Sequence, residues 1–164
     1  MINIIKGSVV FASSEAIVNA ANSSLMGGGG VDGAIHKEAG EKLYDACKDL
    51  GPLETGKAVI TPGFNLKAKY IIHTVGPIYY EHSKEENEKL LSSCYCSCLD
   101  LALKNNIHSI SFPGISTGVY GYPLEDATKV AKRSINKWLD NNNYNIDINF
   151  YCFTDKEYDA YIKK

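Results

Sequence analysis

Most residues able to do chemistry in this sequence gather in one segment, residues 18–36. The segment holds four consecutive glycines at positions 27–30, with Asn22 before them and Asp32 and His36 after them. Consecutive glycines cost backbone entropy, so they make sense where backbone N–H groups must approach a ligand closely. At the start of a helix, those N–H groups and the helix dipole favour a phosphate or diphosphate. The segment predicts an anion-binding loop, with a merely flexible loop as the alternative.

Three polar side chains flank these glycines. A carboxylate such as Asp32 beside a phosphate loop is electrostatically unfavourable unless it binds hydroxyls or a water, although it also suits the first turn of a helix. Asn22 offers an amide donor and a carbonyl acceptor for ribose hydroxyls, or for a local turn. His36 falls one helical turn after Asp32, where a neutral imidazole would orient the carboxylate or a substrate. The pattern favours a sugar phosphate, and a structural role for His36 is the alternative.

A second strand, glycine-rich loop and helix follow at residues 110–123. This loop supplies glycines for close backbone approach, two hydroxyls and a flat ring on which a sugar can rest: Gly114, Gly118, Gly121, Ser116, Thr117 and Tyr120. Residues 114–118 also match the G-x-S-x-G nucleophile elbow of serine hydrolases. A catalytic triad needs a histidine later in the chain, and none follows His108. The match is therefore interpreted as accidental.

Several familiar chemistries are excluded by spacing. No Gly-Lys-Ser/Thr follows the glycines, which excludes a P-loop, and a dinucleotide fold with its ribose-binding acid about 20 residues on is not favoured. Asp32 and His36 have no second ligand pair at helical spacing, so no metal site is expected. The five cysteines lack disulfide or C-x-x-C spacing and should be reduced thiols. On a helix, Cys94 and Cys98 share a face and Cys96 points elsewhere, which argues against zinc.

The composition indicates one ordinary domain over residues 1–164, with 45% hydrophobic residues and a net charge of −2. A chain of this length buries roughly 70% of its unfolded surface without needing a disulfide or metal. The charge balance provides no broad basic field, so nucleic-acid binding is not expected. No apolar run resembles a signal peptide or reaches the ~20 residues of a membrane span. A cytoplasmic protein without membrane binding is expected.

Strand-like and helix-like patterns alternate along the chain. Short β-branched runs predict strands at 2–5, 16–18, 58–60, 70–75, 107–112 and 146–153. Apolar spacings of three and four predict helices over 31–50, 85–103, 123–143 and 155–162. This alternation predicts an α/β sandwich around a mixed, largely parallel sheet. Ligands of such sheets bind beyond the carboxyl ends of the strands, which is where both glycine loops fall.

Together these motifs resemble the macro domain family. They match its MacroD-type branch, which includes bacterial O-acetyl-ADP-ribose deacetylases and mono-ADP-ribosyl-protein hydrolases. The resemblance covers nearly the whole chain, through residues 16–22, 27–36, 55–56, 73–77 and 115–123. It implies a three-layer α/β/α fold that binds ADP-ribose and its esters, with no cofactor and with mono-ADP-ribosylated proteins as candidate partners. The implied reaction is hydrolysis of an ester at the distal ribose, where the acyl group is acetate or a protein Asp/Glu side chain.

The resemblance also assigns roles to individual residues. It implies that Asn22 contacts the distal ribose and that Asp32 activates or positions the attacking water. These two residues form the implied catalytic pair. Whether Asp32 or a substrate phosphate takes the proton stays open. It implies that ADP-ribose is contacted by Ser8, Val9, Ala21, Gly28, Gly29, Gly30, Val31, His36, Ser116, Thr117, Gly118, Val119, Tyr120, Gly121 and Phe153.

The adenine side departs from the family pattern. The family's Gly-Asp-Ile, whose aspartate accepts a hydrogen bond from the adenine amino group, is Gly7-Ser8-Val9 here. Ser8 offers only a weaker, uncharged acceptor, while the backbone N–H of Val9 can still reach the ring. Phe153 resembles the family's adenine-side aromatic, and a core aromatic is the alternative.

Two other functional classes compete with the enzyme. A reader module would bind ADP-ribose without turnover, because phosphate loops serve both purposes. The intact pair of Asn22 and Asp32 favours the enzyme, since a reader needs no acid at that spacing. A binder of single-stranded RNA or poly-ADP-ribose would require basic residues and exposed aromatics along a groove, whereas the 17 Lys and Arg residues are dispersed.

Overall fold

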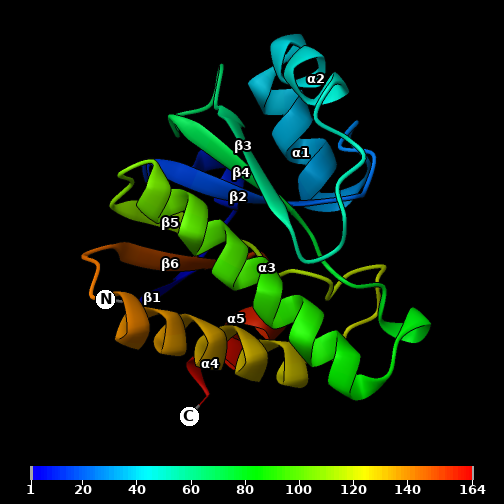
Figure 1. The fold of residues 1–164 in the computed structure, drawn as a ribbon, viewed down its shortest axis with the longest axis vertical. Helices are drawn as coiled ribbons and strands as arrows, with labels where there is room; N and C mark the ends of the chain where they lie inside the picture. The colour runs from blue at the N-terminus through cyan, green and yellow to red at the C-terminus, as the bar shows by residue number, and fades with distance from the viewer. Residues whose placement is uncertain (1, 164) are drawn as a thin grey trace.

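A single six-stranded sheet forms the centre of the computed structural model, which describes residues 2–163 (Figure 1). The strands lie in the order β1-β6-β5-β2-β4-β3. Every neighbouring pair is parallel except β3 with β4. Their bounds are β1 Ile2–Lys6, β2 Ala16–Ala21, β3 Ala58–Pro62, β4 Tyr70–Val75, β5 Ser109–Phe112 and β6 Asp147–Cys152. The predicted mixed, largely parallel sheet is confirmed.

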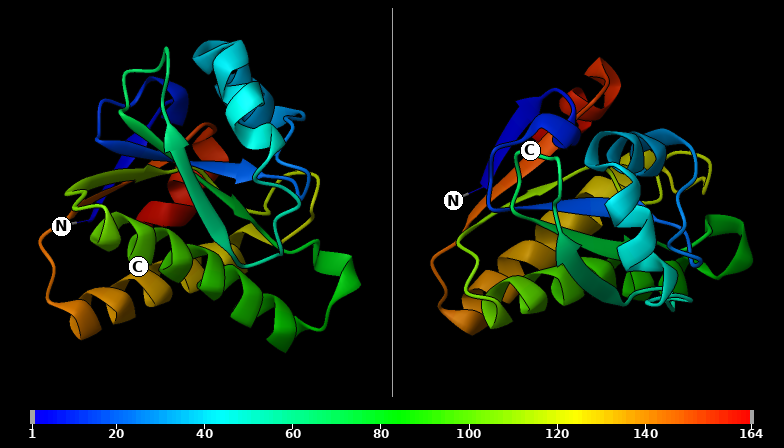
Figure 2. Two further views of the ribbon diagram at one scale, coloured as in Figure 1. Left: turned by 45° about the horizontal axis from the view of Figure 1, so that its top comes forward. Right: turned by 90° about the horizontal axis from the view of Figure 1, so that it is seen from above.

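Helices cover both faces of this sheet. Figure 1 and Figure 2 show α1 and α2 on one face and α3 and α4 on the other. The bounds are α1 Gly30–Ala39, α2 Glu41–Lys48, α3 Lys84–Lys104, α4 Leu124–Asn142 and α5 Asp155–Ile162, with 3-10 turns η1 Val9–Phe11 and η2 Tyr79–Glu81. Within residues 2–163, no helix is long and apolar enough to cross a membrane.

Two apolar cores hold the three layers together. The larger core, around Tyr95, Phe112 and Phe150, joins the sheet to α3, α4 and α5. The smaller core, which includes Ile35 and Leu43, joins the other face to α1 and α2. Strands β2 and β4 supply apolar side chains to both cores, so the β-branched runs and amphipathic helices of the sequence produce the predicted three-layer α/β/α fold.

The expectation of one helix over residues 31–50 is wrong, because Gly40 separates two helices, α1 and α2. This glycine has φ 95° and ψ −179°, a backbone conformation that side chains disfavour. Its N–H donates to the carbonyl of His36 and ends α1. The apolar periodicity continues across the break because Ile35 and Leu43 pack into the same core.

Strand β2 is longer than the predicted 16–18 and continues to Ala21. It pairs with β4 in a parallel register that places Asn19 opposite His73. Both side chains are buried, although a strand that ended at residue 18, as predicted, would place Asn19 in the following loop. The extra residues therefore bring a polar side chain into the interior, directly beneath the first glycine loop.

Candidate functional site

Three loops meet at one edge of the sheet. The first glycine loop, residues 22–29, follows β2, and the second, residues 113–123, follows β5. Since β2 and β5 pair directly in parallel, both loops leave the sheet at the carboxyl edge. A third segment after β4 joins them, because the Tyr79 backbone N–H donates to the Tyr120 carbonyl at 2.8 Å. This edge is the candidate site, as predicted for a sheet of this topology.

The glycine loop opens directly onto the start of α1. Gly29 is the N-cap residue of that helix and supplies no side-chain hydrogen bond to it. Gly28, Gly29 and Gly30 are exposed, and Val31 is half-buried. The first turn of α1 therefore presents backbone N–H groups without a competing side-chain acceptor, which is what a bound phosphate requires.

The two predicted catalytic side chains face the same glycine. A Cβ at Gly28 would lie 3.2 Å from Nδ2 of Asn22 and 3.4 Å from Oδ2 of Asp32. One group comes from the end of β2 and the other from the first turn of α1. An amide nitrogen and a carboxylate oxygen thus converge on the small space beside Gly28, where a Cβ would be crowded against Asn22.

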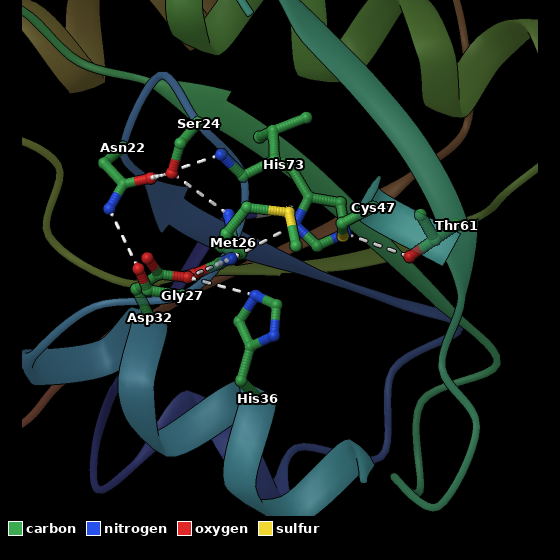
Figure 3. Close-up of polar contacts among 11 residues, drawn as sticks. Asn22, Ser24, Met26, Gly27, Asp32, His36, Cys47, Thr61 and His73 are labelled. Atoms are coloured by element: carbon green, nitrogen blue, oxygen red, sulfur yellow. Dashed lines mark hydrogen bonds and ion pairs between the residues drawn. The ribbon is translucent and has the colours of Figure 1, made fainter. Parts of the chain in front are cut away.

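Asn22 also shapes the loop that carries it. Its Nδ2 donates to the Gly27 carbonyl at 3.0 Å, and its Oδ1 accepts from the Ser24 hydroxyl at 2.8 Å and the Leu25 N–H at 3.2 Å (Figure 3). These bonds are those of a turn-forming asparagine. One Nδ2 hydrogen remains beyond the Gly27 bond, since a primary amide carries two.

Asp32 is buried, with 4% of its surface exposed. Its Oδ1 accepts from Asn19 Nδ2 at 2.9 Å, and His36 Nε2 lies 3.5 Å from the same oxygen (Figure 3). The predicted common face of Asp32 and His36 is confirmed. A buried carboxylate is costly unless hydrogen-bonded, so Asn19 stabilises it in place. Neither ring nitrogen of His36 has a hydrogen-bond partner among residues 2–163.

Sequence reasoning missed two members of this buried cluster, Asn19 and His73. The Asn19 Nδ2 lies 3.1 Å from His73 Nδ1, and His73 Nε2 lies 2.9 Å from the Thr61 hydroxyl. Desolvation by burial, with a smaller contribution from His36, lowers the pKa of His73 to about 3, so this imidazole is neutral. The available signal was a polar residue inside each of two apolar strands.

The second loop contains a constrained serine. Ser116 has φ 67°, and a Cβ on Gly76 would lie 2.1 Å from its hydroxyl, so only glycine fits at position 76. Within residues 2–163 that hydroxyl has no hydrogen-bond partner. A nucleophilic serine needs a base within hydrogen-bond reach. The structure therefore gives no base to the rejected nucleophile elbow.

The remaining residues of the second loop form its outer part. Gly118, Val119 and Gly121 are exposed, while Thr117 and Tyr120 are half-buried. Burial and then the negative charges of Asp32 and Glu81 raise the pKa of the Tyr120 hydroxyl.

The predicted adenine side lies where β1 and β6 end together. The Gly7 N–H donates to the Cys152 carbonyl at 2.9 Å, and Ser8 and Phe153 directly follow these two residues. Strand β6 thus ends one residue before the predicted 153. Phe153 is 76% exposed, so the core-aromatic alternative is wrong. Phe11, at the end of η1, is 60% exposed and was not anticipated.

Ser8 already has a structural task at this end. Its hydroxyl accepts a hydrogen bond from the Val10 N–H at 3.3 Å and caps η1. The side chains of Val9 and Ala21 are buried in the smaller core, so only their backbones remain for a ligand. The contacts of these residues with adenine stay predictions.

The cysteines are free thiols inside the helices and strands. Burial raises the pKa of Cys47, Cys94 and Cys152 to about 11, and that of Cys98 well above its usual value. Among residues 2–163, no group of three or more His, Cys, Asp or Glu side chains is arranged to hold a metal ion.

The fold and the paired loops define a macro domain, and the comparison with known proteins agrees. The model of the Macro domain family matches residues 18–131, and the chain belongs to this family. The Macro domain-containing protein CT2219 of Chlorobaculum tepidum is 47% identical over 163 residues, which covers 99% of this chain and 94% of that protein.

One further relative is named as an enzyme, and another was solved in complex with a ligand. Human ADP-ribose glycohydrolase MACROD2 is 45% identical over 164 residues, so the match covers 99% of this chain but only 39% of MACROD2. The Trypanosoma brucei macrodomain, solved in complex with ADP-ribose, has a TM-score of 0.91 and 43% identity. That alignment covers 98% of this chain and 67% of the trypanosomal chain.

Proposed function

We propose that this protein is an ADP-ribose-binding hydrolase that cleaves acyl esters at the distal ribose with a positioned water. The observation that carries the proposal is the convergence of Asn22 Nδ2 and Asp32 Oδ2 on Gly28, at 3.2 and 3.4 Å from the position a Cβ would take. The similarity to MACROD2, named an ADP-ribose glycohydrolase, and to a macrodomain bound to ADP-ribose supports it.

Diphosphate binding falls to the backbone of the two loops. The uncapped first turn of α1 supplies N–H donors and the positive end of its dipole. The exposed backbone of Gly118, Val119 and Gly121 closes the opposite side, with the Tyr120 ring against the distal ribose. This arrangement holds the anion without a lysine or arginine, in keeping with a net charge of −2.

Catalysis follows from the unequal use of the two Asp32 oxygens. Oδ1 is held by Asn19, whereas Oδ2 makes no hydrogen bond within residues 2–163 and faces Gly28. Oδ2 and the remaining Nδ2 hydrogen of Asn22 then bind the ribose hydroxyls and the attacking water. Such preorganised positioning lowers the barrier because the reacting groups meet without further loss of freedom. Neither a cofactor nor a metal takes part in these steps.

The reader module is the second candidate, because the same loops bind ADP-ribose without turnover. What favours the enzyme is the burial of Asp32, which a reader would have no reason to maintain. A buried carboxylate is costly unless it is hydrogen-bonded, and Oδ2 of Asp32, which makes no hydrogen bond within residues 2–163, is left for a ligand at Gly28.

The decisive experiment incubates the purified chain with O-acetyl-ADP-ribose and, separately, with a protein carrying ADP-ribose on glutamate. Release of ADP-ribose is followed by chromatography. We expect turnover of at least one ester, and loss of it in Asp32→Asn, which keeps an acceptor for Asn19 but removes the charge. Binding of ADP-ribose by calorimetry without any release would instead establish the reader. The relative rates would identify the acyl group, acetate or protein.

A further inference from the structure

A continuous series of hydrogen bonds leads from Asp32 across three strands. It runs from Asp32 on α1 to Asn19 on β2 at 2.9 Å, to His73 on β4 at 3.1 Å and to Thr61 on β3 at 2.9 Å. Figure 3 shows the His73 ring between Thr61 and the glycine loop. All four side chains are buried, so no solvent competes for these bonds.

The donors and acceptors in this series have only one consistent arrangement. The Asn19 amide nitrogen is a donor, so His73 Nδ1 must accept and carry no proton. A neutral imidazole then holds its single proton on Nε2, where the Thr61 oxygen accepts it. The Cys47 sulfur, 4.0 Å from Nε2, is a far weaker partner. The Asn19 donor therefore fixes the tautomer of His73, and the Thr61 hydroxyl satisfies the remaining Nε2 proton.

This arrangement also fixes the Asn19 amide. One of its two hydrogens goes to Asp32 and the other to His73, while its Oδ1 has no partner within residues 2–163. Rotating the amide by half a turn would point Oδ1 at the carboxylate and at the imidazole lone pair together. Two acceptors thus hold the amide where one would leave it free to tilt.

We propose that His73, whose Nδ1 accepts from Asn19 and whose Nε2–H is satisfied by Thr61, is a positioning residue that directs the Asp32 carboxylate through Asn19. The inference rests on the proposed hydrolase function and adds a residue that does not touch the substrate. With Oδ1 anchored, Oδ2 keeps its aim at the space over Gly28. Small displacements of a reacting group have large effects on rate. We therefore expect His73, which is two hydrogen bonds away from Asp32, to affect turnover more than binding.

The test uses Thr61→Val, a change of nearly constant shape that removes the acceptor for Nε2–H. Without it, the Nε2–H is left buried and unpaired, or the proton moves to Nδ1 and opposes the Asn19 donor, and either outcome weakens the hold on Asn19. We expect kcat for O-acetyl-ADP-ribose to fall about 5- to 10-fold. KM and the Kd for ADP-ribose should stay within about twofold, because the loops that bind the diphosphate are unchanged.

The matched control is Thr74→Val, on the same strand as His73. Thr74 is buried, and its hydroxyl donates to the Lys57 carbonyl at 2.8 Å, so the variant also loses one buried hydrogen bond. Nothing links that bond to Asp32. We expect a comparable fall in melting temperature but a kcat within about twofold of the parent. Equal kcat values for the two valine variants would overturn the inference.

A second pair of variants tests the acceptor itself. His73→Asn can place an oxygen near the position of Nδ1 and accept from Asn19, whereas His73→Leu cannot. We expect the asparagine variant to retain several-fold more kcat than the leucine variant when both are folded. A leucine variant as fast as the asparagine variant would contradict the proposed role.

A readout that needs no turnover separates this inference from the proposed function. Nitrogen-15 spectra of the histidine ring should show the Nε2–H tautomer for His73 in the parent and an increased Nδ1–H fraction in Thr61→Val. An Nδ1–H ring in the parent would overturn the inference even if the hydrolase is active. Absence of turnover with the expected tautomer would overturn the proposed function and leave His73 as an anchor of Asp32 alone.

Discussion

The two ends of the candidate site differ sharply in how their residues are held. At the Asp32 end, Asn19 and His73 are buried. Asn19 donates one hydrogen bond to Asp32 and another to His73. At the Ser8 end, Phe11 and Phe153 are 60% and 76% exposed, and the Ser8 hydroxyl makes one hydrogen bond at 3.3 Å. One end is part of the protein interior and the other lies on its surface.

This difference matches the tasks proposed for each end. A reacting water must be placed within a fraction of an ångström, which requires buried groups that hydrogen bonds hold in place. A flat base needs mainly apolar area, which exposed aromatic rings provide with little constraint. The Ser8 end is also where the chain departs from the family pattern, while Asn22 and Asp32 match it. Substitutions at the two ends should therefore have effects of different size.

The largest effect is expected from Asp32→Ala at the buried end. Loss of the carboxylate should reduce turnover by about 10²- to 10⁴-fold, because a group that acts on the reacting water is gone. Affinity for ADP-ribose should change only a few-fold, since the backbone holds the diphosphate. Steady-state kinetics with calorimetry measures both quantities. Equal losses in rate and affinity would mean that Asp32 only anchors the ligand.

The buried end should also respond to pH through His73, which faces Asn19, Thr61, Cys47 and His36. Its pKa is about 3 when folded, against an ordinary value of 6.5. Between these values the unfolded chain takes up a proton that the folded chain refuses, so stability falls as pH decreases below about 6.5. Above pH 6.5 the ring is neutral in both states and contributes no slope.

Urea unfolding at pH 7 and pH 5 measures this loss. The parent should lose about 2 kcal/mol more than His73→Asn over that interval, at about 1.4 kcal/mol per pH unit below 6.5. The asparagine variant is the control because all other titrating groups are shared. Parallel losses in the two proteins would show that His73 is protonated in the folded state.

A smaller effect is expected at the exposed end from Ser8→Asp. A carboxylate accepts a stronger hydrogen bond from the adenine amino group than a hydroxyl does, and it can still cap η1. We expect ADP-ribose affinity to rise by a factor of about three. Inosine-diphosphate-ribose, with a carbonyl at that position, should be repelled. If calorimetry shows an unchanged preference between the two ligands, Ser8 does not contact the adenine base.

The smallest effect is expected from Ser116→Ala, on the loop between the two ends. Its hydroxyl has no base beside it, so turnover should fall less than about threefold. A loss of several orders of magnitude, together with an acyl-enzyme detected by mass spectrometry, would replace the water mechanism with a serine nucleophile.

Much of the architecture could be predicted because it depends on local pattern. The alternation of short apolar runs and amphipathic stretches specifies strands and helices in order, and that order requires a largely parallel sheet. Pro123 marks the start of α4, and Asn143, at φ 43°, marks its end. The spacing of Asp32 and His36 places them on one face of α1, and their contact at 3.5 Å follows from helical geometry alone.

Only the tertiary structure decided the features that depend on distant residues. The break at Gly40 is invisible to periodicity because both helices pack on one core. Phe153 is exposed because β6 ends one residue before it, which strand propensity does not specify. Above all, Asn19 and His73 meet because β2 and β4 pair in one register, and a shift of one strand by one residue would place the two side chains on opposite faces. Register is set by contacts across more than fifty positions of sequence, so the anchor of Asp32 exists only in the folded chain.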